Sequence, residues 1–221
     1  MQLTVVTGAN RGIGLALTTL LKQRGHHVVA SCRKTSPALD ALGVEVVQGA
    51  DVSDTQGIAK LRDAIGDRRV DVLINNAGIL VWEANLAALD VAAIQRQFEV
   101  NALAPLLVTR ALRPTLASGS KVAMITSRMG SIADNSSGGA YGYRMSKAAL
   151  NMAGKTLSIE LKPAGIAVAI LHPGMVSTEM IGFQGQIEPD EAAKGLLARI
   201  DALTLETSGS FWHQNGEALP W

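Results

Sequence analysis

Short runs of β-branched and aliphatic residues alternate with longer amphipathic segments along this chain of 221 residues. Six such runs predict strands: residues 3–6, 27–30, 44–47, 72–74, 121–126 and 166–171, with a last strand expected around Phe211. Four segments predict helices: residues 13–24, 55–65, 94–116 and 140–161. Strands separated by helices usually pair in parallel, with helices on both faces of the sheet. The pattern therefore predicts an α/β fold, a doubly wound parallel sheet in a single domain over residues 1–221.

The overall composition argues against nucleic acid, membranes and metal ions as partners. Lysine and arginine number 20 against 19 acidic residues, and a net charge of +1 gives no reason to expect nucleic acid or a membrane surface. The apolar stretches are shorter than the roughly 20 residues of a membrane span. Cys32 is the only cysteine, and no cysteine and histidine grouping has metal-ligand spacing, so we expect no disulfide and no metal. Because no signal segment follows Met1, we expect a cytoplasmic protein.

A glycine-rich turn lies between the first strand and the first helix. Gly8, Gly12 and Gly14 let the backbone approach a ligand closely, and the helix that follows offers free amide groups and a partial positive charge. A strand, such a turn and a helix together favour binding of a dinucleotide pyrophosphate, as in Rossmann-type folds. A tight turn with a purely structural role is the alternative interpretation.

The end of the second strand indicates which dinucleotide. No acidic residue stands where an NAD enzyme would bind the ribose hydroxyl, and Arg33 and Lys34 occupy that region. Arg33 together with Arg11 could hold a 2′-phosphate through charge-assisted hydrogen bonds. We therefore expect NADPH/NADP+ rather than NADH, the alternative being that both arginines are solvated surface charges.

Tyr143 and Lys147 are the residues that most suggest catalysis. Four residues apart in a predicted helix, they lie on one face of it. A nearby ammonium favours the phenolate, so we expect a lowered pKa for Tyr143 and a role in proton transfer. Tyr141 is a second phenol, but it has no lysine four residues later.

Two further polar residues are candidates for the same site. Ser127 directly follows a predicted strand at the carboxyl edge of the sheet, where its hydroxyl could donate to a carbonyl oxygen. Ser131, Ser136 and Ser137 are nearby alternatives that follow the strand less closely. Asn101 is a poor helix former inside a predicted helix, which suggests either a functional task or a satisfied buried amide.

Several motifs in order resemble the short-chain dehydrogenase/reductase family. They are Thr7-Gly8-Ala9-Asn10-Arg11-Gly12-Ile13-Gly14, Asn75-Asn76-Ala77-Gly78, the pair Tyr143 and Lys147, and His172-Pro173-Gly174-Met175-Val176-Ser177-Thr178. The segment from Ser127 to Ile132, the region 36–42 and the short chain are similar to the carbonyl-reductase branch that includes the Sniffer and C-factor proteins. The interval of 143 − 127 = 16 residues between serine and tyrosine is slightly longer than in the family.

The resemblance implies roles for individual residues. The implied coenzyme-binding residues are Gly8, Asn10, Arg11, Gly12, Ile13, Gly14, Arg33, Asp51, Val52, Asn76, Ala77, Gly78, Tyr143, Lys147, Pro173, Gly174, Val176 and Thr178. The implied catalytic residues are Asn101, Ser127, Tyr143 and Lys147, with Tyr143 as general acid and Asn101 holding a water that leads to the lysine. His172 and Cys32 are interpreted as structural.

The implied activity is NADPH-dependent reduction of aldehydes, ketones or dicarbonyls by a homodimer. The apolar residues Met180, Ile181 and Phe183, with residues 80–82 opposite, suggest an open pocket for a hydrophobic small-molecule carbonyl substrate, unless they only pack the core or a subunit contact. A non-enzymatic NADP(H) sensor or signalling protein is the main alternative, although it has no need for Ser127, Tyr143 and Lys147 together. A nucleotide-sugar epimerase or dehydratase would usually need a larger carboxyl-terminal region.

Overall fold

The fold is a parallel sheet of seven strands, in a computed structural model that describes all residues 1–221. The strands lie in the order β3-β2-β1-β4-β5-β6-β7. Their bounds are β1 Leu3–Thr7, β2 His27–Cys32, β3 Glu45–Gln48, β4 Val70–Asn75, β5 Leu116–Ile125, β6 Ala167–His172 and β7 Phe211–His213. The helices are α1 Gly12–Gln23, α2 Pro37–Asp40, α3 Thr55–Ile65, α4 Val91–Phe98, α5 Ala104–Leu112, α6 Tyr141–Leu161 and α7 Pro189–Asp201. The predicted doubly wound α/β fold is therefore confirmed.

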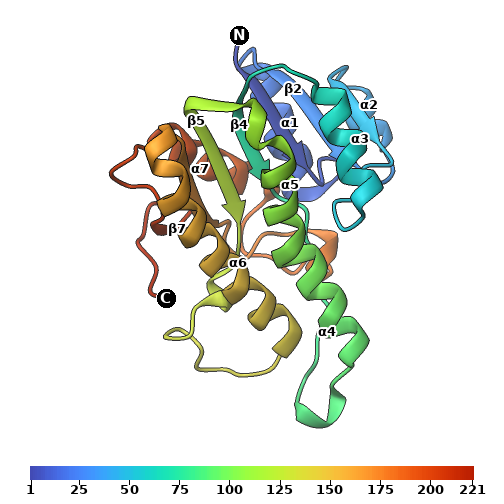
Figure 1. Cartoon of the computed structure of the whole chain (residues 1–221). Helices are drawn as coiled ribbons and strands as arrows, with labels where there is room; N and C mark the ends of the chain where they lie inside the picture. Colours follow the sequence, from blue (N-terminus) through green and yellow to red (C-terminus); the bar gives the residue numbers. More distant parts are fainter.

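Alternate residues of each strand belong to opposite faces of the sheet. On β1, Val5 packs with α3, α5 and α6, whereas its neighbour Val6 packs with α1 and α7. Because both faces are covered, the central strands are apolar almost throughout, and Val5, Val6 and Leu73 have no exposed surface. Figure 1 shows α3, α5 and α6 on the near face of the sheet. The figure also shows α4 and the first turns of α6 extending beyond the carboxyl end of β5.

The strand predicted at residues 121–126 begins earlier, at Leu116. Ser118, Gly119 and Ser120 are typical of a turn, but the structure places them in an irregularity where the pairing with β4 shifts register. Gly119 takes a positive φ of 88°, and the Ser120 hydroxyl donates to the Val70 carbonyl at 2.7 Å. The Ser120 side chain thus replaces a backbone hydrogen bond between β4 and β5. The local sequence does not indicate this replacement.

The helix predicted at residues 94–116 has three parts. It begins earlier, at Val91, because the Asp90 carboxylate caps it by accepting from the Ala93 amide at 3.1 Å. A π-helical turn at Glu99–Leu103 separates α4 from α5, and the helix ends at Leu112, before a short 3₁₀ turn that contains Pro114. The short helix α2 and the long helix α7 were not predicted from the sequence.

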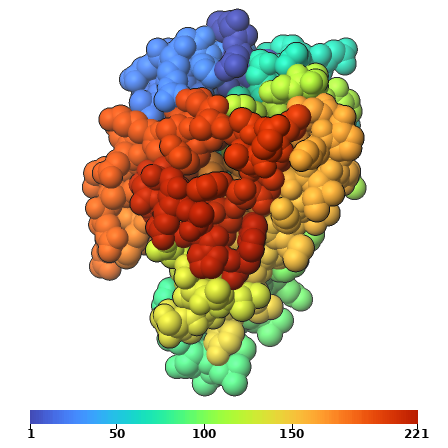
Figure 2. Space-filling view, turned by 90° about the vertical axis from the view of Figure 1, so that its left-hand side faces the viewer, coloured from blue at the N-terminus to red at the C-terminus, as the bar shows by residue number.

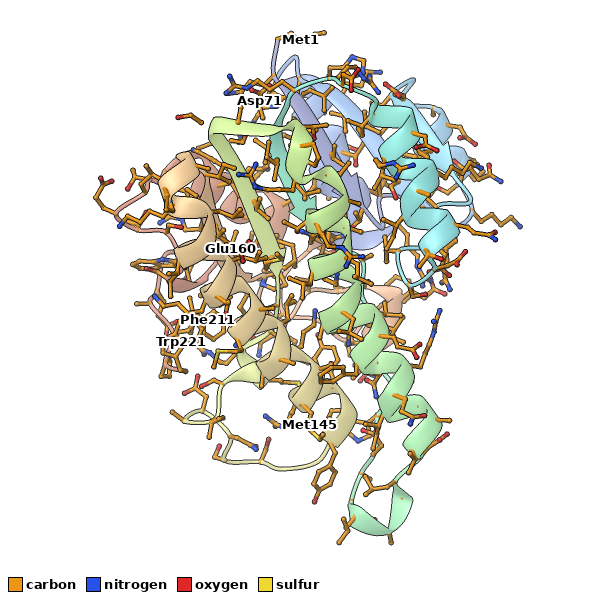
Figure 3. The ribbon with its side chains drawn as sticks, viewed as in Figure 1. Met1, Asp71, Met145, Glu160, Phe211 and Trp221 are labelled. Carbon is orange, nitrogen blue, oxygen red and sulfur yellow. The ribbon has the colours of Figure 1, made fainter.

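The carboxyl-terminal residues cover the β7 edge of the sheet. The expected strand around Phe211 is present as β7, and the rings of Phe211 and Trp221 stack with centroids 5.5 Å apart. Figure 3 labels the two residues close together. The Ala133 amide donates to the Trp221 carbonyl at 2.9 Å, which ties the loop before α6 to the chain end. Figure 2 shows these red residues beside α6 and above the yellow loop. None of the helices combines the length and apolarity that a membrane span requires.

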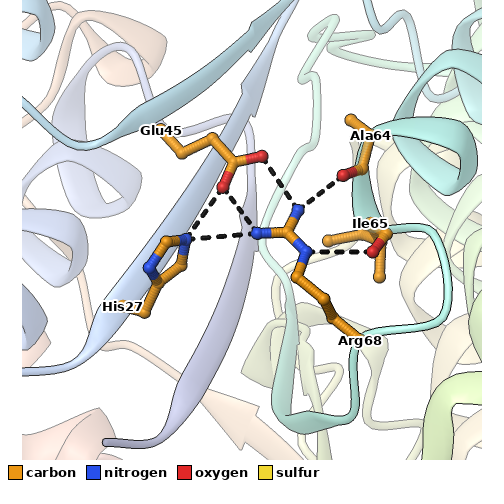
Figure 4. Close-up of polar contacts among 5 residues, drawn as sticks. All are labelled: His27, Glu45, Ala64, Ile65 and Arg68. Atoms are coloured by element: carbon orange, nitrogen blue, oxygen red, sulfur yellow. Dashed lines mark hydrogen bonds and ion pairs between the residues drawn. The ribbon is translucent and has the colours of Figure 1, made fainter.

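A polar cluster joins β2, β3 and the end of α3 at the opposite edge. The Arg68 guanidinium donates to both carboxylate oxygens of Glu45, at 2.7 and 2.9 Å, and a His27 ring nitrogen lies 2.8 Å from the same carboxylate (Figure 4). Arg68 also donates to the Ile65 carbonyl at the end of α3. Hydrogen bonds from Arg68, opposed by burial and aided by His27, lower the pKa of Glu45 to about 2.

We predict that this cluster stabilises the fold in a pH-dependent way. The folded pKa of Glu45 lies below its ordinary value of 4.5, so the stabilisation is complete above that value and is lost as pH falls towards about 2. For a bidentate but partly solvated pair, Glu45→Gln should lower the free energy of unfolding at neutral pH by about 1 kcal/mol. Urea denaturation measures this difference, which should vanish in acid; an equal difference at both pH values would contradict the assignment.

Candidate functional site

A cleft of about 1490 Å³ lies at the carboxyl edge of the sheet. Of the residues expected to bind the coenzyme, all line this cleft: Gly8, Asn10, Arg11, Gly12, Ile13, Gly14, Arg33, Asp51, Val52, Asn76, Ala77, Gly78, Tyr143, Lys147, Pro173, Gly174, Val176 and Thr178. Ser127 also lines it, whereas Asn101 lies behind its wall. The structure thus brings together residues that lie far apart in the sequence, since Gly8 and Thr178 are 178 − 8 = 170 positions apart.

The turn between β1 and α1 requires two of its glycines. A Cβ on Gly14 would lie 2.1 Å from the Gly8 carbonyl oxygen, and a Cβ on Gly8 would lie 2.9 Å from the Ala77 Cα. Gly8 also has a φ of 66°, in the left-handed region that glycine favours. The turn can therefore close tightly on the end of β4 only without side chains at these positions.

The first turn of α1 is free to meet an anion. Arg11 occupies the position before the helix but its side chain caps no amide, and no acidic residue stands in the first turn. Amide groups at a helix start that have no protein partner, together with the helix dipole, attract phosphate. This geometry and the glycine cradle fit a dinucleotide pyrophosphate.

Asn76 and Thr7 fix the turn to the neighbouring strand. The Asn76 side-chain amide donates to the carbonyls of Thr7, at 2.9 Å, and Gly8, at 3.3 Å. In return, the Thr7 hydroxyl accepts from the backbone amides of Asn76 and Ala77. These crossed bonds hold the ends of β1 and β4 side by side. Asn76 therefore shapes the cleft wall by fixing the backbone that forms it.

Charged residues at the β2 end of the cleft differ in their partners. Arg11 forms an ion pair with Glu179, while Arg33 is exposed and has no acidic partner within 4.0 Å. Burial would raise the pKa of Asp51, but hydrogen bonds from Ser53 and the nearby Arg96 outweigh it and lower that pKa. The structure therefore leaves Arg33, more than Arg11, free to meet a phosphate at this end.

Tyr143 and Lys147 lie on the same face of α6, as predicted. The Lys147 ammonium nitrogen is 5.7 Å from the centroid of the Tyr143 ring and donates to the Ile125 carbonyl at 3.0 Å. Burial lowers the pKa of Lys147 to about 8, because the charged form is poorly solvated. Its ammonium is therefore largely kept at neutral pH and is lost as pH rises through this value.

The expected lowering of the Tyr143 pKa is wrong for this structure. Burial raises the pKa of Tyr143 to about 12, and interaction with the Ser127 hydroxyl offsets only part of the rise. The lysine bonds to a carbonyl oxygen instead of the phenol, so desolvation of the phenolate is the larger effect. The phenol is therefore protonated at neutral pH but is a weaker acid than an ordinary tyrosine, so its loss of a proton depends on a neighbouring group that stabilises the phenolate.

Ser127 is the serine that the structure places beside Tyr143. Its oxygen accepts from the Met129 amide at 3.2 Å, at the start of a 3₁₀ turn over Arg128–Gly130, so its hydroxyl hydrogen is left to donate to the Tyr143 oxygen or to a ligand. Ser131 is buried and its oxygen instead accepts from the Asp134 amide. Of the alternatives considered, only Ser137 also lines the cleft.

Asn101 is a fully buried amide in the π-helical turn. Its side chain accepts from the Ile79 amide and donates to the Ile79 carbonyl, both at 2.8 Å, and it also donates to the Ser146 hydroxyl at 3.0 Å. The side-chain atoms of Asn101 are therefore satisfied, and its implied role in holding a water that leads to the lysine stays a prediction. Asn101 holds the segment after β4 against α6, close to Lys147.

Glu83 is a residue that the sequence analysis missed. Its carboxylate is 2% exposed, accepts from the Gly142 amide in the first turn of α6 at 3.3 Å, and accepts from the buried Gln97 amide at 3.2 Å. The Glu83 backbone carbonyl accepts from the Ala140 amide at 2.7 Å. Since no side chain at the start of α6 caps the helix, Glu83 does so from 59 residues earlier.

The remaining cleft wall is partly apolar and partly cationic. Met180, Ile181 and Phe183 line it from one side, and Leu80 and Trp82 line it from the other. Trp82 is 62% exposed and Phe183 is 68% exposed, so these two side chains do not pack the core. Residues that lie in the cleft and were not predicted as site residues include Arg96, Arg128, Met129, Arg144 and Gln184.

His172 and Cys32, which the sequence analysis interprets as structural, both border the cleft. His172 ends β6, where burial, aided by the nearby His213, lowers its pKa to about 3 and so keeps the ring neutral. Cys32 is buried at the end of β2 and borders the cleft.

Comparison of the sequence with protein families and curated proteins gives clear matches. Residues 2–188 match the family model described as short chain dehydrogenase. A 1-hydroxy-2-glutathionyl-2-methyl-3-butene dehydrogenase from Rhodococcus sp. (strain AD45) is 40% identical over 227 aligned positions, which cover 100% of both chains. The C-signal protein of Myxococcus xanthus is 48% identical over 154 positions, covering 69% of this chain and 93% of that protein.

Solved structures with the same fold are also similar in sequence. A carbonyl reductase from Pseudomonas aeruginosa PAO1 in complex with NADP has a TM-score of 0.89 and 34% identity, covering 100% of both chains. The carbonyl reductase Sniffer of D. melanogaster has a TM-score of 0.89 and 28% identity, covering 100% of this chain and 99% of that one. The predicted resemblance to Sniffer and C-factor proteins is confirmed by these similarities.

Proposed function

Because the chain belongs to the short-chain dehydrogenase/reductase family, we propose that it is a carbonyl reductase that uses NADPH to reduce aldehydes, ketones or dicarbonyls. The observation that carries the proposal is the grouping of Tyr143, Lys147 and Ser127 in one cleft with the glycine turn of Gly8 and Gly14. The carbonyl reductases among the similar structures, one of them in complex with NADP, support the same activity.

The proposed mechanism assigns a task to each side chain. NADPH, when bound, supplies the hydride. Ser127 donates its free hydroxyl hydrogen to the substrate carbonyl oxygen and orients it. Tyr143, which its raised pKa keeps protonated, donates the proton that this oxygen takes up. The Lys147 ammonium stabilises the phenolate that results, and Asn101 holds the backbone that borders the lysine.

We predict that Tyr143→Phe lowers kcat for aldehyde reduction by at least about 100-fold, since it removes the general acid. The decrease of NADPH absorbance with time measures the rate. The Kd for NADPH, measured by fluorescence, should stay within about threefold of wild type because the phenyl ring remains. Tyr141→Phe is the matched control, because Tyr141 is 39% exposed and lies outside the cleft lining. Near-normal turnover of Tyr143→Phe would rule out the mechanism.

The preference for NADPH is proposed to depend on Arg33. A charge-assisted hydrogen bond is worth about 1.5–3 kcal/mol, so one bond to the 2′-phosphate gives a preference of more than about tenfold. Arg33→Ala should therefore reduce the ratio of kcat/KM for NADPH over NADH by at least about tenfold. Arg62→Ala, a change on the exposed face of α3, is the control. A wild-type ratio at or below about tenfold would remove the proposed preference.

The same cleft supports a second candidate. The name of the Rhodococcus relative describes oxidation of a hydroxyl compound that carries a glutathionyl group, and the same residues could run in that direction. The similarity to the C-signal protein favours a signalling role as a further alternative. Tight NADPH binding without turnover on a broad panel of carbonyls and alcohols would support signalling over catalysis.

We also propose a homodimer that acts as a small-molecule enzyme in the cytoplasm. Met145, Met152 and Ile159 are each at least 53% exposed and recur every seven residues, so they form one apolar stripe along α6, whose two ends Figure 3 marks near Met145 and Glu160. A two-fold related copy would present the same stripe and cover it. Met152→Glu should convert a dimer to a monomer in light scattering; a wild-type monomer would refute the assembly.

A further inference from the structure

Arg144 has an unusual set of partners for a cation in a cleft. Its Nη2 donates to the Ser137 hydroxyl at 2.8 Å and its Nε donates to the Gly139 carbonyl at 3.1 Å. A further acceptor is the carbonyl of Gly138. All these acceptors are neutral, no carboxylate lies within 4.0 Å, and Nη1 donates to nothing. The guanidinium is thus held in place while its charge stays uncompensated.

The other arginines around the cleft show the contrast. Arg11 pairs with Glu179, Arg96 pairs with Asp51 and Glu99, and Arg128 pairs with Asp134 and Glu217. Arg33, which also lacks an acidic partner, lies at the other end of the cleft, after β2. On the side that Tyr143 occupies, Arg144 is therefore the arginine whose charge the protein does not neutralise.

An apolar surface adjoins this guanidinium. A Cβ built on Gly139, whose carbonyl Arg144 binds, would lie 3.8 Å from the Trp82 indole. Trp82 is 62% exposed and lines the cleft. Trp82 and Arg144 therefore both border residue 139 in the cleft, so a ligand that meets the guanidinium also has an aromatic side chain nearby.

We propose that Arg144 binds a carboxylate of the substrate, so that the preferred substrates are carbonyl compounds with an anionic group and an apolar spacer that packs on Trp82. This inference rests on the proposed reductase function. Arg144 directly follows Tyr143 on α6, and neighbouring helical residues point in different directions. Carboxylate and carbonyl therefore occupy different parts of the cleft, and a guanidinium with free hydrogens recognises a carboxylate well.

The test compares acids with their methyl esters. The substrates are 4-carboxybenzaldehyde and the longer 4-formylcinnamic acid, each with its methyl ester. The proteins are wild type, Arg144→Gln and Arg144→Lys. Lys194→Gln is the control, because Lys194 is exposed on α7 and lies outside the cleft. For at least one length, wild type should prefer the acid by at least about tenfold in kcat/KM. Arg144→Gln should lower the acid-to-ester ratio about tenfold by raising KM for the acid, and Arg144→Lys should lie between.

Two results would overturn the inference. One is an acid-to-ester ratio that is the same in wild type and Arg144→Gln, and the other is an equal fall for acid and ester, which would mean that Arg144 only anchors residues 137–139. If wild type reduces no aldehyde, the proposed function fails, and the inference is then judged by calorimetry. Binding of 4-(hydroxymethyl)benzoate with NADP+ should be at least about tenfold tighter than that of its methyl ester, and Arg144→Gln should abolish the difference.

Discussion

The common direction of the seven strands is the constraint on which the rest of the structure depends. Parallel pairing brings every strand's carboxyl end to one edge, so the residues after β1, β2, β4, β5 and β6 meet there although they are far apart in sequence. The pairing is held at its centre by the crossed bonds of Thr7 and Asn76. Because these bonds join β1 to β4, they fix the position where the strand order changes direction and where the cleft opens.

Burial sets the chemistry of the site more strongly than the proximity of charges does. Lys147 is 4% exposed and Tyr143 is partly buried in the cleft wall, and this burial raises the pKa of the phenol and lowers the pKa of the ammonium. The two effects move the pKa values apart, to about 12 for the phenol and about 8 for the ammonium, so both groups are mainly protonated at neutral pH and the lysine is the closer to losing its proton. In the direction of reduction, the donor therefore starts in the correct state without help from the lysine.

Much of this site was predictable because it depends on local spacing. The four-residue spacing of Tyr143 and Lys147 puts them on one helix face, and the glycines at 8 and 14 stand at positions where no side chain fits. The start of α7 was also readable, since Pro189, Asp190 and Glu191 are typical of a first helical turn.

Other features depend on contacts that no local pattern contains. Ser120 joins the β4–β5 ladder by bonding to Val70, 50 residues earlier, and Glu83 caps a helix that begins far along the chain. The raised pKa of Tyr143 results from how deeply α6 is packed, which spacing alone does not give. Sequence patterns thus identified which residues take part, and tertiary packing decided their partners and protonation.

The dependence of α6 on Glu83 has a consequence for how the protein matures. The middle of this helix can form from its own sequence, but its first turn, which carries Tyr143, gains its cap only after the chain around Glu83 has docked. Closing a loop of 59 residues costs entropy before any bond is gained, as does the contact of Thr7 with Asn76 across 69 residues at the centre of the sheet. The phenol therefore reaches its working position only together with the long-range contacts of the folded protein, and not when its helix alone has formed.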